Sequence, residues 1–205
     1  MVYKELDPPD WDQLSTISRR TADEQMPYYL RRFFGKSTQV DVLNQLCVST
    51  GGVETRVDHL VIHPYGLVVV DSRSVSGRWQ VREDGRWICL DHLPATESVS
   101  PILLAYAQAR SLKVFLEKKV RQKGFFEQVE LDVLVAVPDT DAIEWSAKGA
   151  LAEICNADEV PRRIDAHIEQ YRSLGVGPGL LVQEQRRRLA GFLCAKHRVG
   201  AAAVL

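Results

Sequence analysis

Several functional classes are excluded by what the sequence lacks. Its four cysteines, Cys47, Cys89, Cys155 and Cys194, are scattered, and no Cys-x-x-Cys pair occurs, which argues against a zinc ribbon. Cys194 and His197 have half of a zinc-ligand spacing, but the sequence supplies no second pair. We therefore expect a helical cysteine and an exposed histidine at these two positions.

Long apolar runs and an excess of charge are also absent. No apolar run approaches the length of a membrane span, and no basic segment followed by an apolar one marks a signal peptide. We therefore expect no membrane partner and a cytoplasmic location. Lys and Arg number 26 against 27 Asp and Glu, a balance unlike that of a nucleic-acid packaging protein, although a local basic surface is still possible. No feature of the sequence predicts an oligomeric state.

The length of 205 residues fits one domain with additions at its ends. We expect an N-terminal arm at residues 1–19, an α/β core at residues 20–140 and a helical C-terminal extension, packed on the core, at residues 141–205. Apolar periodicity predicts helices at residues 21–34, 99–119, 159–172 and 180–196. Strands are predicted at residues 38–48, 54–63, 66–73, 77–81, 86–90 and 129–137. The last of these follows a helical crossover and should join the sheet.

Some side chains are assigned within these elements. The first helix has one apolar stripe, which consists of Met26, Tyr29, Leu30 and Phe33. Pro27 lies close enough to the start of this helix to be tolerated in a first turn. The three successive arginines that begin at Arg186 are interpreted as a solvated face. Trp79 and Trp87 are expected to pack on the second hairpin rather than to stack on bases.

One stretch predicts a β-hairpin around the turn Pro-Tyr-Gly at residues 64–66. With a two-residue loop, His63 pairs with Gly66, and the same register places Asp58 opposite Asp71. Cross-strand neighbours have Cβ atoms about 4.5–5.5 Å apart, and like charges there destabilise a sheet. A divalent cation is the natural compensation, because Mg²⁺ prefers oxygen ligands and often takes only one or two protein carboxylates.

Strand alternation places a cation beside these acids. Residues two apart share a face, so Asp71 and Arg73 point the same way. The apolar run at residues 67–70 is typical of a central strand buried on both faces, which makes Asp71 the first polar group to leave the core. Arg73 would then hold the attacking water or stabilise charge on a phosphate. The alternative is an ordinary ion pair between the two at the end of a strand.

Four segments of the sequence carry a family pattern: Val57-Asp58-His59, Pro64-Tyr65-Gly66, Asp71-Ser72-Arg73 and Ser76-Gly77-Arg78-Trp79. In order and spacing they resemble the nuclease-related domain (NERD) family, which looks like a branch of the PD-(D/E)xK nuclease superfamily. The signature of that family is approximately Ile-Asp-His, hydrophobics, Pro-x-Gly, hydrophobics, Glu-x-Lys and a Gly-Trp stretch. The resemblance covers residues 20–137 of this chain.

The helices on either side of the hairpin also resemble the family. Its members tend to carry a Glu in a helix before the hairpin, and Glu24 fits that position. After the hairpin they have a helix that opens near Asn-Pro and carries a Gln, and Ser100, Pro101 and Gln108 resemble it. Both residues have a structural alternative, since a carboxylate such as Glu24 is favoured near a helix start by the helix dipole and Gln108 could be a solvated helix residue.

The resemblance implies both a fold and a function. The fold would be α/β, a mixed central β-sheet flanked by helices, with a restriction-endonuclease-like core and a helical C-terminal appendix. The function would be that of a metal-dependent nuclease-like domain, with nucleic acid, DNA rather than RNA, as its partner and Mg²⁺ or Mn²⁺ as its cofactor. Asp58 and Asp71 would hold the metal ion. The implied catalytic residues are Asp58, Asp71, Arg73, Glu24 and Gln108.

Two of these positions depart from the family pattern. Asp71 replaces the usual Glu and is shorter by one methylene, and Arg73 replaces Lys. Arginine stays protonated in proteins, so Arg73 cannot supply a neutral base, but it can supply positive charge and grip a phosphate bidentately. The alternatives to an active or impaired nuclease are a catalytically inactive nucleic-acid-binding module and a protein-interaction module on the same fold.

Overall fold

The structure is a computed structural model of the chain. It describes residues 1–6, 17–73, 78–91, 96–120, 124, 126, 129–137, 143–145, 151–175 and 181–198, without the side chains of residues 17–24, 96 and 145. The helices of this part are α1 (Ile17–Phe34), α2 (Pro101–Lys119), α3 (Val160–Ser173) and α4 (Gln183–Lys196). None of them combines the length and the apolar character that crossing a membrane requires.

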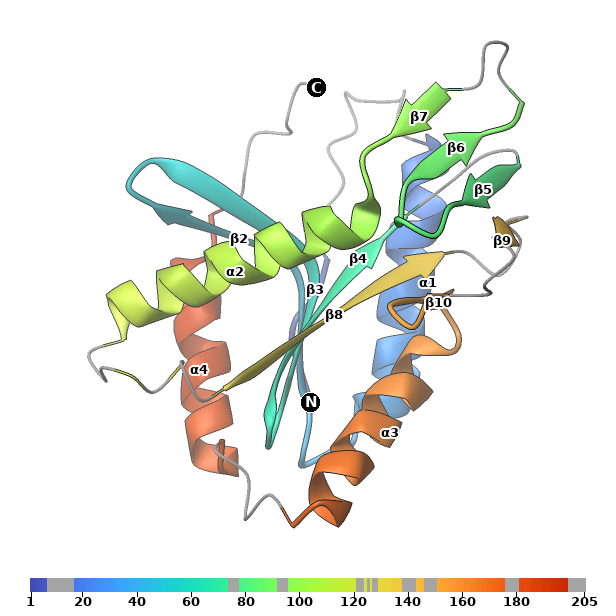
Figure 1. Cartoon of the computed structure of the whole chain (residues 1–205). Helices are drawn as coiled ribbons and strands as arrows, with labels where there is room; N and C mark the ends of the chain where they lie inside the picture. The colour runs from blue at the N-terminus through green and yellow to red at the C-terminus, as the bar shows by residue number, and fades with distance from the viewer. Residues whose placement is uncertain are drawn as a thin grey trace.

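Six strands form the central sheet, in the order β1-β2-β3-β4-β8-β10 (Figure 1). They are β1 (Val2–Lys4), β2 (Asp41–Thr50), β3 (Val53–His63), β4 (Gly66–Ser72), β8 (Glu130–Val137) and β10 (Ile154–Asn156). Neighbours among β2, β3 and β4 are antiparallel, whereas β8 joins β4 in parallel after the crossover through α2. A mixed sheet flanked by helices confirms the predicted α/β fold class.

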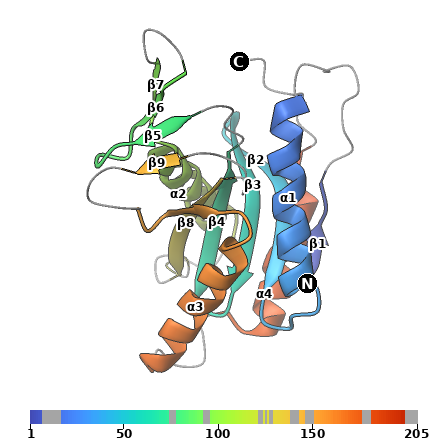
Figure 2. The same cartoon turned by 90° about the vertical axis from the view of Figure 1, so that its right-hand side faces the viewer.

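Helices cover both faces of this sheet (Figures 1 and 2). Residues of α2 and α4 form one core cluster with Leu60 and Val69, and residues of α1 and α3 form the other with Val61 and Val70. Successive residues of β3 and β4 therefore enter opposite clusters, as the period of a strand requires. Burial on both faces explains the continuous apolar run of β4 and confirms its prediction as a central strand.

The β3–β4 hairpin has the predicted register. His63 pairs with Gly66, and the ladder continues outward to His59 and Val70. At Gly66 a Cβ would lie 2.5 Å from the carbonyl oxygen of Glu130, because β8 approaches β4 closely at this point. Only glycine, which has no side chain, fits at this end of the turn. The two-residue loop then fixes the register of β3 and β4.

A second, smaller sheet lies beyond the carboxyl end of β4 (Figure 1). Its strands are β5 (Trp79–Val81), β6 (Trp87–Cys89), β7 (Thr96–Ser98) and β9 (Ile143–Trp145), in the order β7-β6-β5-β9. Trp87 is buried, and its ring centroid lies 6.1 Å from that of Trp79. The predicted hairpin and the packing of these two rings on it are confirmed.

Two predictions for α1 are wrong. The helix begins at Ile17, so Pro27 lies in its interior rather than in its first turn, where it removes a backbone donor. The predicted stripe is wrong at Phe33, whose side chain is exposed: Met26 and Leu30 are buried as expected, Tyr29 is partly buried beside them, and Phe34 takes the place of Phe33. Residues four apart lie above one another on a helix, and this row is the one that faces the sheet.

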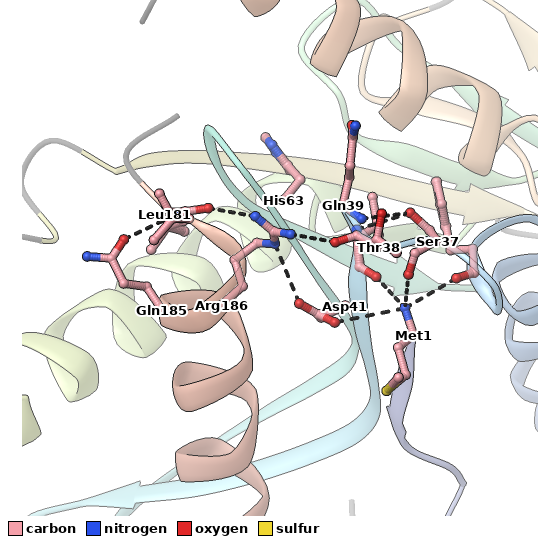
Figure 3. Close-up of polar contacts among 12 residues, drawn as sticks. Met1, Ser37, Thr38, Gln39, Asp41, His63, Leu181, Gln185 and Arg186 are labelled. Carbon is pink, nitrogen blue, oxygen red and sulfur yellow. Dashed lines mark hydrogen bonds and ion pairs between the residues drawn. The ribbon is translucent and has the colours of Figure 1, made fainter. Parts of the chain in front are cut away.

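The predicted solvated face of α4 is also wrong at Arg186, which is buried and whose polar contacts are drawn in Figure 3. Its Nε lies 3.5 Å from Oδ2 of Asp41, and its Nη1 and Nη2 donate to the carbonyls of Leu181 and Thr38 at 2.7 and 2.8 Å. The other two arginines are exposed. Successive residues of a helix point about 100° apart, so one of the three faces β2 when α4 packs on it.

The carboxylate of Asp41 lies at the start of β2, at the end of the sheet opposite to Asp71. The amino group of Met1 lies 3.9 Å from Oδ1 of Asp41 (Figure 3). Burial raises the pKa of Asp41, while the charges of the amino group and of Arg186 oppose that shift. Burial likewise lowers the pKa of Arg186 against the effect of Asp41. Each charge therefore depends on the other to remain buried.

The C-terminal part adds more than helices. Strand β10, which the sequence did not predict, extends the sheet beyond β8. His197 is half-buried rather than exposed: its Nδ1 accepts a hydrogen bond from the amide of Cys47 at 3.1 Å, and the amide of Arg198 donates to the carbonyl of Cys47 at 3.0 Å. His197 and Arg198 therefore cover the edge of β2 at Cys47, on the side of β2 that faces away from β3. The division of the chain into an arm, a core and an extension stays a prediction.

Candidate functional site

The carboxyl end of β4 carries two of the predicted site residues. Leu67 and Val69 face the α2 side of the sheet, and Asp71 continues this alternation with 2% of its surface exposed. The Nε of Arg73 lies 2.5 Å from Oδ2 of Asp71, and 31% of the Arg73 side chain is exposed. Asp71 is thus a buried carboxylate paired with a cation that reaches solvent.

Asp58 lies beside this pair but outside the regular ladder. The β3–β4 ladder ends at His59 and Val70, one step before Asp58 and Asp71 would pair. The Oδ2 of Asp58 instead accepts a hydrogen bond from the backbone amide of Ser72, at 3.0 Å. A side-chain bond therefore joins Asp58 to the end of β4 at the place where the backbone ladder stops.

An irregularity in β2 coincides with Asp58. Gln45 has a φ of +49°, a left-handed conformation that is uncommon for a residue other than glycine. The β2–β3 ladder keeps its register on both sides but skips Gln45 and Asp58. Leu43 and Leu46, three residues apart, both enter the α2-side cluster, so the alternation reverses across the skipped pair. Such strained positions are concentrated at functional sites.

A buried hydrogen-bond network lies on the other face of the same strands. His59 Nδ1 lies 2.9 Å from Oδ1 of Asn44, and its Nε2 lies 2.9 Å from Oγ of Ser72. Burial lowers the pKa of His59 to about 3, so the ring is neutral. Sequence reasoning assigned no role to these three residues, because alternation puts His59 on the face away from the acids. The sequence feature that could have pointed to this network is His59 itself, which follows Asp58 directly as the His of the family pattern.

Gln108 lines an open groove of about 500 Å³ between α2 and the outer part of β3. The groove is lined by Glu54, Thr55, Arg56, Leu104, Ala107, Gln108 and Ser111. The side-chain oxygen of Gln108 is buried, and within the described part of the chain nothing hydrogen-bonds to it, whereas the residue as a whole is half-buried, so its role stays a prediction. Arg56, which forms an ion pair with Glu54 at 3.6 Å, brings a cation to the same groove.

Two parts of the predicted site lie outside what the structure describes. Glu24 is in the first half of α1, but its side chain is among those not described. Ser76 and Gly77 of the family pattern lie in the undescribed segment after Arg73. The structure therefore brings Asp58, Asp71 and Arg73 together, and it places Gln108 against β3, the strand that carries Asp58.

The residues at the end of β4 are suited to a hydrated divalent cation. Over the described ranges, no group of three or more His, Cys, Asp or Glu side chains is arranged to hold a metal ion. Mg²⁺, however, usually keeps several waters and binds through one or two carboxylates, and a buried carboxylate such as Asp71 requires a cationic partner. Asp58 and Asp71 supply hard oxygen donors for such an ion, while Arg73 holds one oxygen of Asp71.

Comparison with known proteins gives one family. Residues 19–138 match the family model of the nuclease-related domain, NERD. The matched range includes all five predicted site residues, together with the hairpin, α2 and β8. No curated protein and no solved structure matches the chain.

Proposed function

The chain belongs to the nuclease-related domain family, and on that premise we propose that it binds nucleic acid and hydrolyses phosphodiester bonds with Mg²⁺ or Mn²⁺. The observation that carries the proposal is the Asp71 carboxylate, buried at the end of a central strand against Arg73 and next to Asp58. At the carboxyl end of β4, two acids that can hold a metal ion lie beside a fixed cation. Together the metal ion and the cation would supply the positive charge that stabilises a phosphodiester during hydrolysis.

Asp58 and Asp71 would hold the metal ion, which when bound activates water and neutralises charge on the phosphate. Arg73 remains protonated, so its part is to donate hydrogen bonds and stabilise developing negative charge. Its Nε stays on Asp71, while the exposed part of the side chain is free to meet a phosphate oxygen. Gln108 would position water or phosphate from α2, and Glu24 would assist from α1.

We further propose DNA as the substrate and the cytoplasm as the location. Arg56, in the groove that Gln108 also lines, supports contact with a phosphate backbone. The four cysteines are free thiols, three of them buried, which favours a reducing compartment.

Cleavage of plasmid and single-stranded DNA with Mg²⁺ or Mn²⁺ tests the proposed activity. Asp71→Ala should lower the rate by about 100-fold or more, because it removes a group that acts on transition-state charge. Asp132→Asn is the matched control, since Asp132 is a half-buried carboxylate on neighbouring β8, near the other end of the sheet. An Asp71→Ala protein as active as the wild type would refute the assignment.

The Arg73–Asp71 ion pair favours a second candidate function, nucleic-acid binding without cleavage. A guanidinium already lies on Oδ2 of Asp71, so a metal ion must compete with it. This function predicts binding that weakens steeply with salt, without metal-dependent cleavage. A calorimetric Mn²⁺ titration of wild type and Asp58→Ala separates the two: binding by the wild type alone supports the nuclease, and its absence from both supports the binding module.

A further inference from the structure

We infer that His59 is a positioning residue, which holds Ser72 in place and thereby fixes the end of β4. Ser72 lies between Asp71 and Arg73, so whatever fixes Ser72 also fixes the two residues on either side of it. The consequence for catalysis rests on the proposed function, whereas the hydrogen-bond chain rests on the structure alone.

The direction of each hydrogen bond in the chain follows from one fixed donor. The Nδ2 of Asn44 donates to the carbonyl of Lys4 at 3.1 Å, so Oδ1 of Asn44 is left as the acceptor that faces His59. The proton of the neutral imidazole must then be on Nδ1, and Nε2 accepts. The hydroxyl of Ser72 is therefore the donor to Nε2, at 2.9 Å. The chain crosses β1, β2, β3 and β4 in one direction.

Ser72 is held from two sides. Its hydroxyl donates to His59, and its backbone amide donates to Oδ2 of Asp58 at 3.0 Å. The neighbouring amide of Arg73 donates to the carbonyl of Ala136 on β8 at 2.8 Å. Asp58 and His59, adjacent residues of β3, therefore both accept hydrogen bonds from Ser72 of β4. Ser72 lies two residues beyond Val70, where the β3–β4 ladder ends.

The bonds to Ser72 compensate for the end of the β3–β4 ladder, whereas the β4–β8 ladder continues through Asp71 and Ser72. Past Val70 the β3–β4 ladder supplies no further pair, and β3 itself is irregular at Asp58. Without the bond from His59, Ser72 would lose its side-chain link to β3 and keep its amide bond to Asp58. A loosened Ser72 would move Asp71 relative to Asp58, and small displacements of reacting groups cost large factors in rate.

NMR of the metal-free protein tests the hydrogen-bond chain without any need for activity. The imidazole ¹⁵N shifts of His59 should show the Nδ1–H tautomer at neutral pH. His59→Phe should speed hydrogen exchange of the amide at position 72 by about fivefold to tenfold, the size expected for one lost hydrogen bond. His63→Phe is the matched control, because His63 is equally buried on β3 but accepts from the amide of Tyr65 instead. An Nε2–H tautomer, or unchanged exchange in His59→Phe, would overturn the inference.

Substitutions of Ser72 test the positioning role. Ser72→Ala keeps the backbone amide but loses the hydroxyl, so Mn²⁺ affinity and kcat should each fall about fivefold to tenfold, with KM unchanged. Ser72→Thr restores a hydroxyl and should restore both values, which a general loss of stability would not allow. Ser173→Ala, which removes a hydroxyl bonded to the carbonyl of Gln170 on α3, should change neither.

The NMR measurements test the hydrogen-bond chain, and the activity measurements test the proposed function and the positioning role, so each can be refuted separately. If the wild type neither binds Mn²⁺ nor cleaves DNA, the proposed function fails, and the exchange and tautomer results still decide the inference. If the wild type is active and Ser72→Ala equals it in both Mn²⁺ affinity and kcat, the positioning role is wrong even though the hydrogen-bond chain exists.

Discussion

Asp71 and Arg73 depart from the Glu-x-Lys of the family in opposite directions. The acid is shorter by one methylene, and the base has the longer reach and a planar fork of donors. In the structure the two meet at 2.5 Å between Nε and Oδ2. We interpret the two replacements as coupled, because Nε of Arg73 lies one bond nearer to the backbone than the Nζ of a Lys would, just as the Asp71 carboxylate lies one bond nearer than that of a Glu.

This interpretation predicts non-additive substitutions. Arg73→Lys alone should lower metal-dependent cleavage by about tenfold, since the Nζ of Lys lies one bond further out than Nε and fits the shorter acid poorly, and Asp71→Glu alone should crowd Arg73 with a similar loss. The double substitution Asp71→Glu with Arg73→Lys should recover most of the activity. The cycle is measured from initial rates of DNA cleavage. Losses that simply add in the double variant would contradict coupling.

At the scale of elements, α4 is joined to the sheet by a polar contact as well as by apolar packing. The apolar packing is made by Leu189, Ala190 and Leu193, which belong to the α2-side core cluster. One turn earlier in α4, Arg186 contacts Asp41 and donates to the carbonyls of Leu181 and Thr38 (Figure 3). A guanidinium this deeply buried has no water to replace a lost partner. The contact therefore fixes where α4 lies along β2.

Removing this cation should be far more costly than removing its neighbour. Arg186→Met leaves Asp41 buried without its guanidinium, and we expect the free energy of unfolding to fall by about 3 kcal/mol. Arg187→Met, one residue further along the same helix and exposed, should stay within about 0.5 kcal/mol of the wild type. Urea unfolding followed by circular dichroism measures both.

A second substitution separates the loss of charge pairing from the loss of packing. Adding Asp41→Asn to Arg186→Met removes the remaining buried charge and should recover part of the stability. Equal urea midpoints for Arg186→Met and Arg187→Met would show that the buried contact contributes nothing.

At the scale of the whole molecule, the parts of the fold that follow from local chemistry could be predicted from the sequence. The turn at residues 64–66 fixed the register of β3 and β4, and the apolar run of β4 identified a strand buried on both faces. From these two facts the neighbourhood of Asp58, Asp71 and Arg73 followed. The fold class was implied by the resemblance to the NERD family, and the strand order of the sheet and the helical crossover agree with it.

The remaining features depend on contacts between distant segments. The burial of Arg186 depends on Asp41, and the half-burial of His197 depends on the edge of β2. The reversal at Gln45 follows no rule of alternation, and the grip of His59 on Ser72 requires β2, β3 and β4 to be in place together. Periodicity within one segment carries no information on any of these.

Two buried histidines make the whole fold sensitive to acid. Burial lowers the pKa of His59 to about 3, and burial lowers that of His63 to about 4, with smaller effects from His167 and Arg186, against an ordinary value of 6.5. Below pH 6.5 the unfolded chain binds protons that the folded chain does not bind until the lower values are reached. The free energy of unfolding should therefore fall as the pH drops from 6.5 towards 4, by on the order of 3 kcal/mol for each histidine.

Urea unfolding at several pH values between 7 and 4.5 measures this loss. His63→Phe should remove about half of the histidine contribution to the slope of stability against pH. His167→Gln is the control, since about half of the His167 side chain is exposed and it has no comparable burial to lose. An unchanged slope in His63→Phe would show that the ring is not kept neutral by the fold.

The bond between Arg186 and Thr38 joins residues that are 148 positions apart in the chain. During synthesis at roughly 5–20 residues per second, Thr38 is added to the chain about 7 to 30 seconds before Arg186. During that interval the β3–β4 hairpin can form and bring Asp58 and Asp71 into place. The carboxylate of Asp41, however, has no guanidinium with which it can be buried as an ion pair. The nascent chain should therefore stay open at this end of the sheet until α4 has been made and packs on β2.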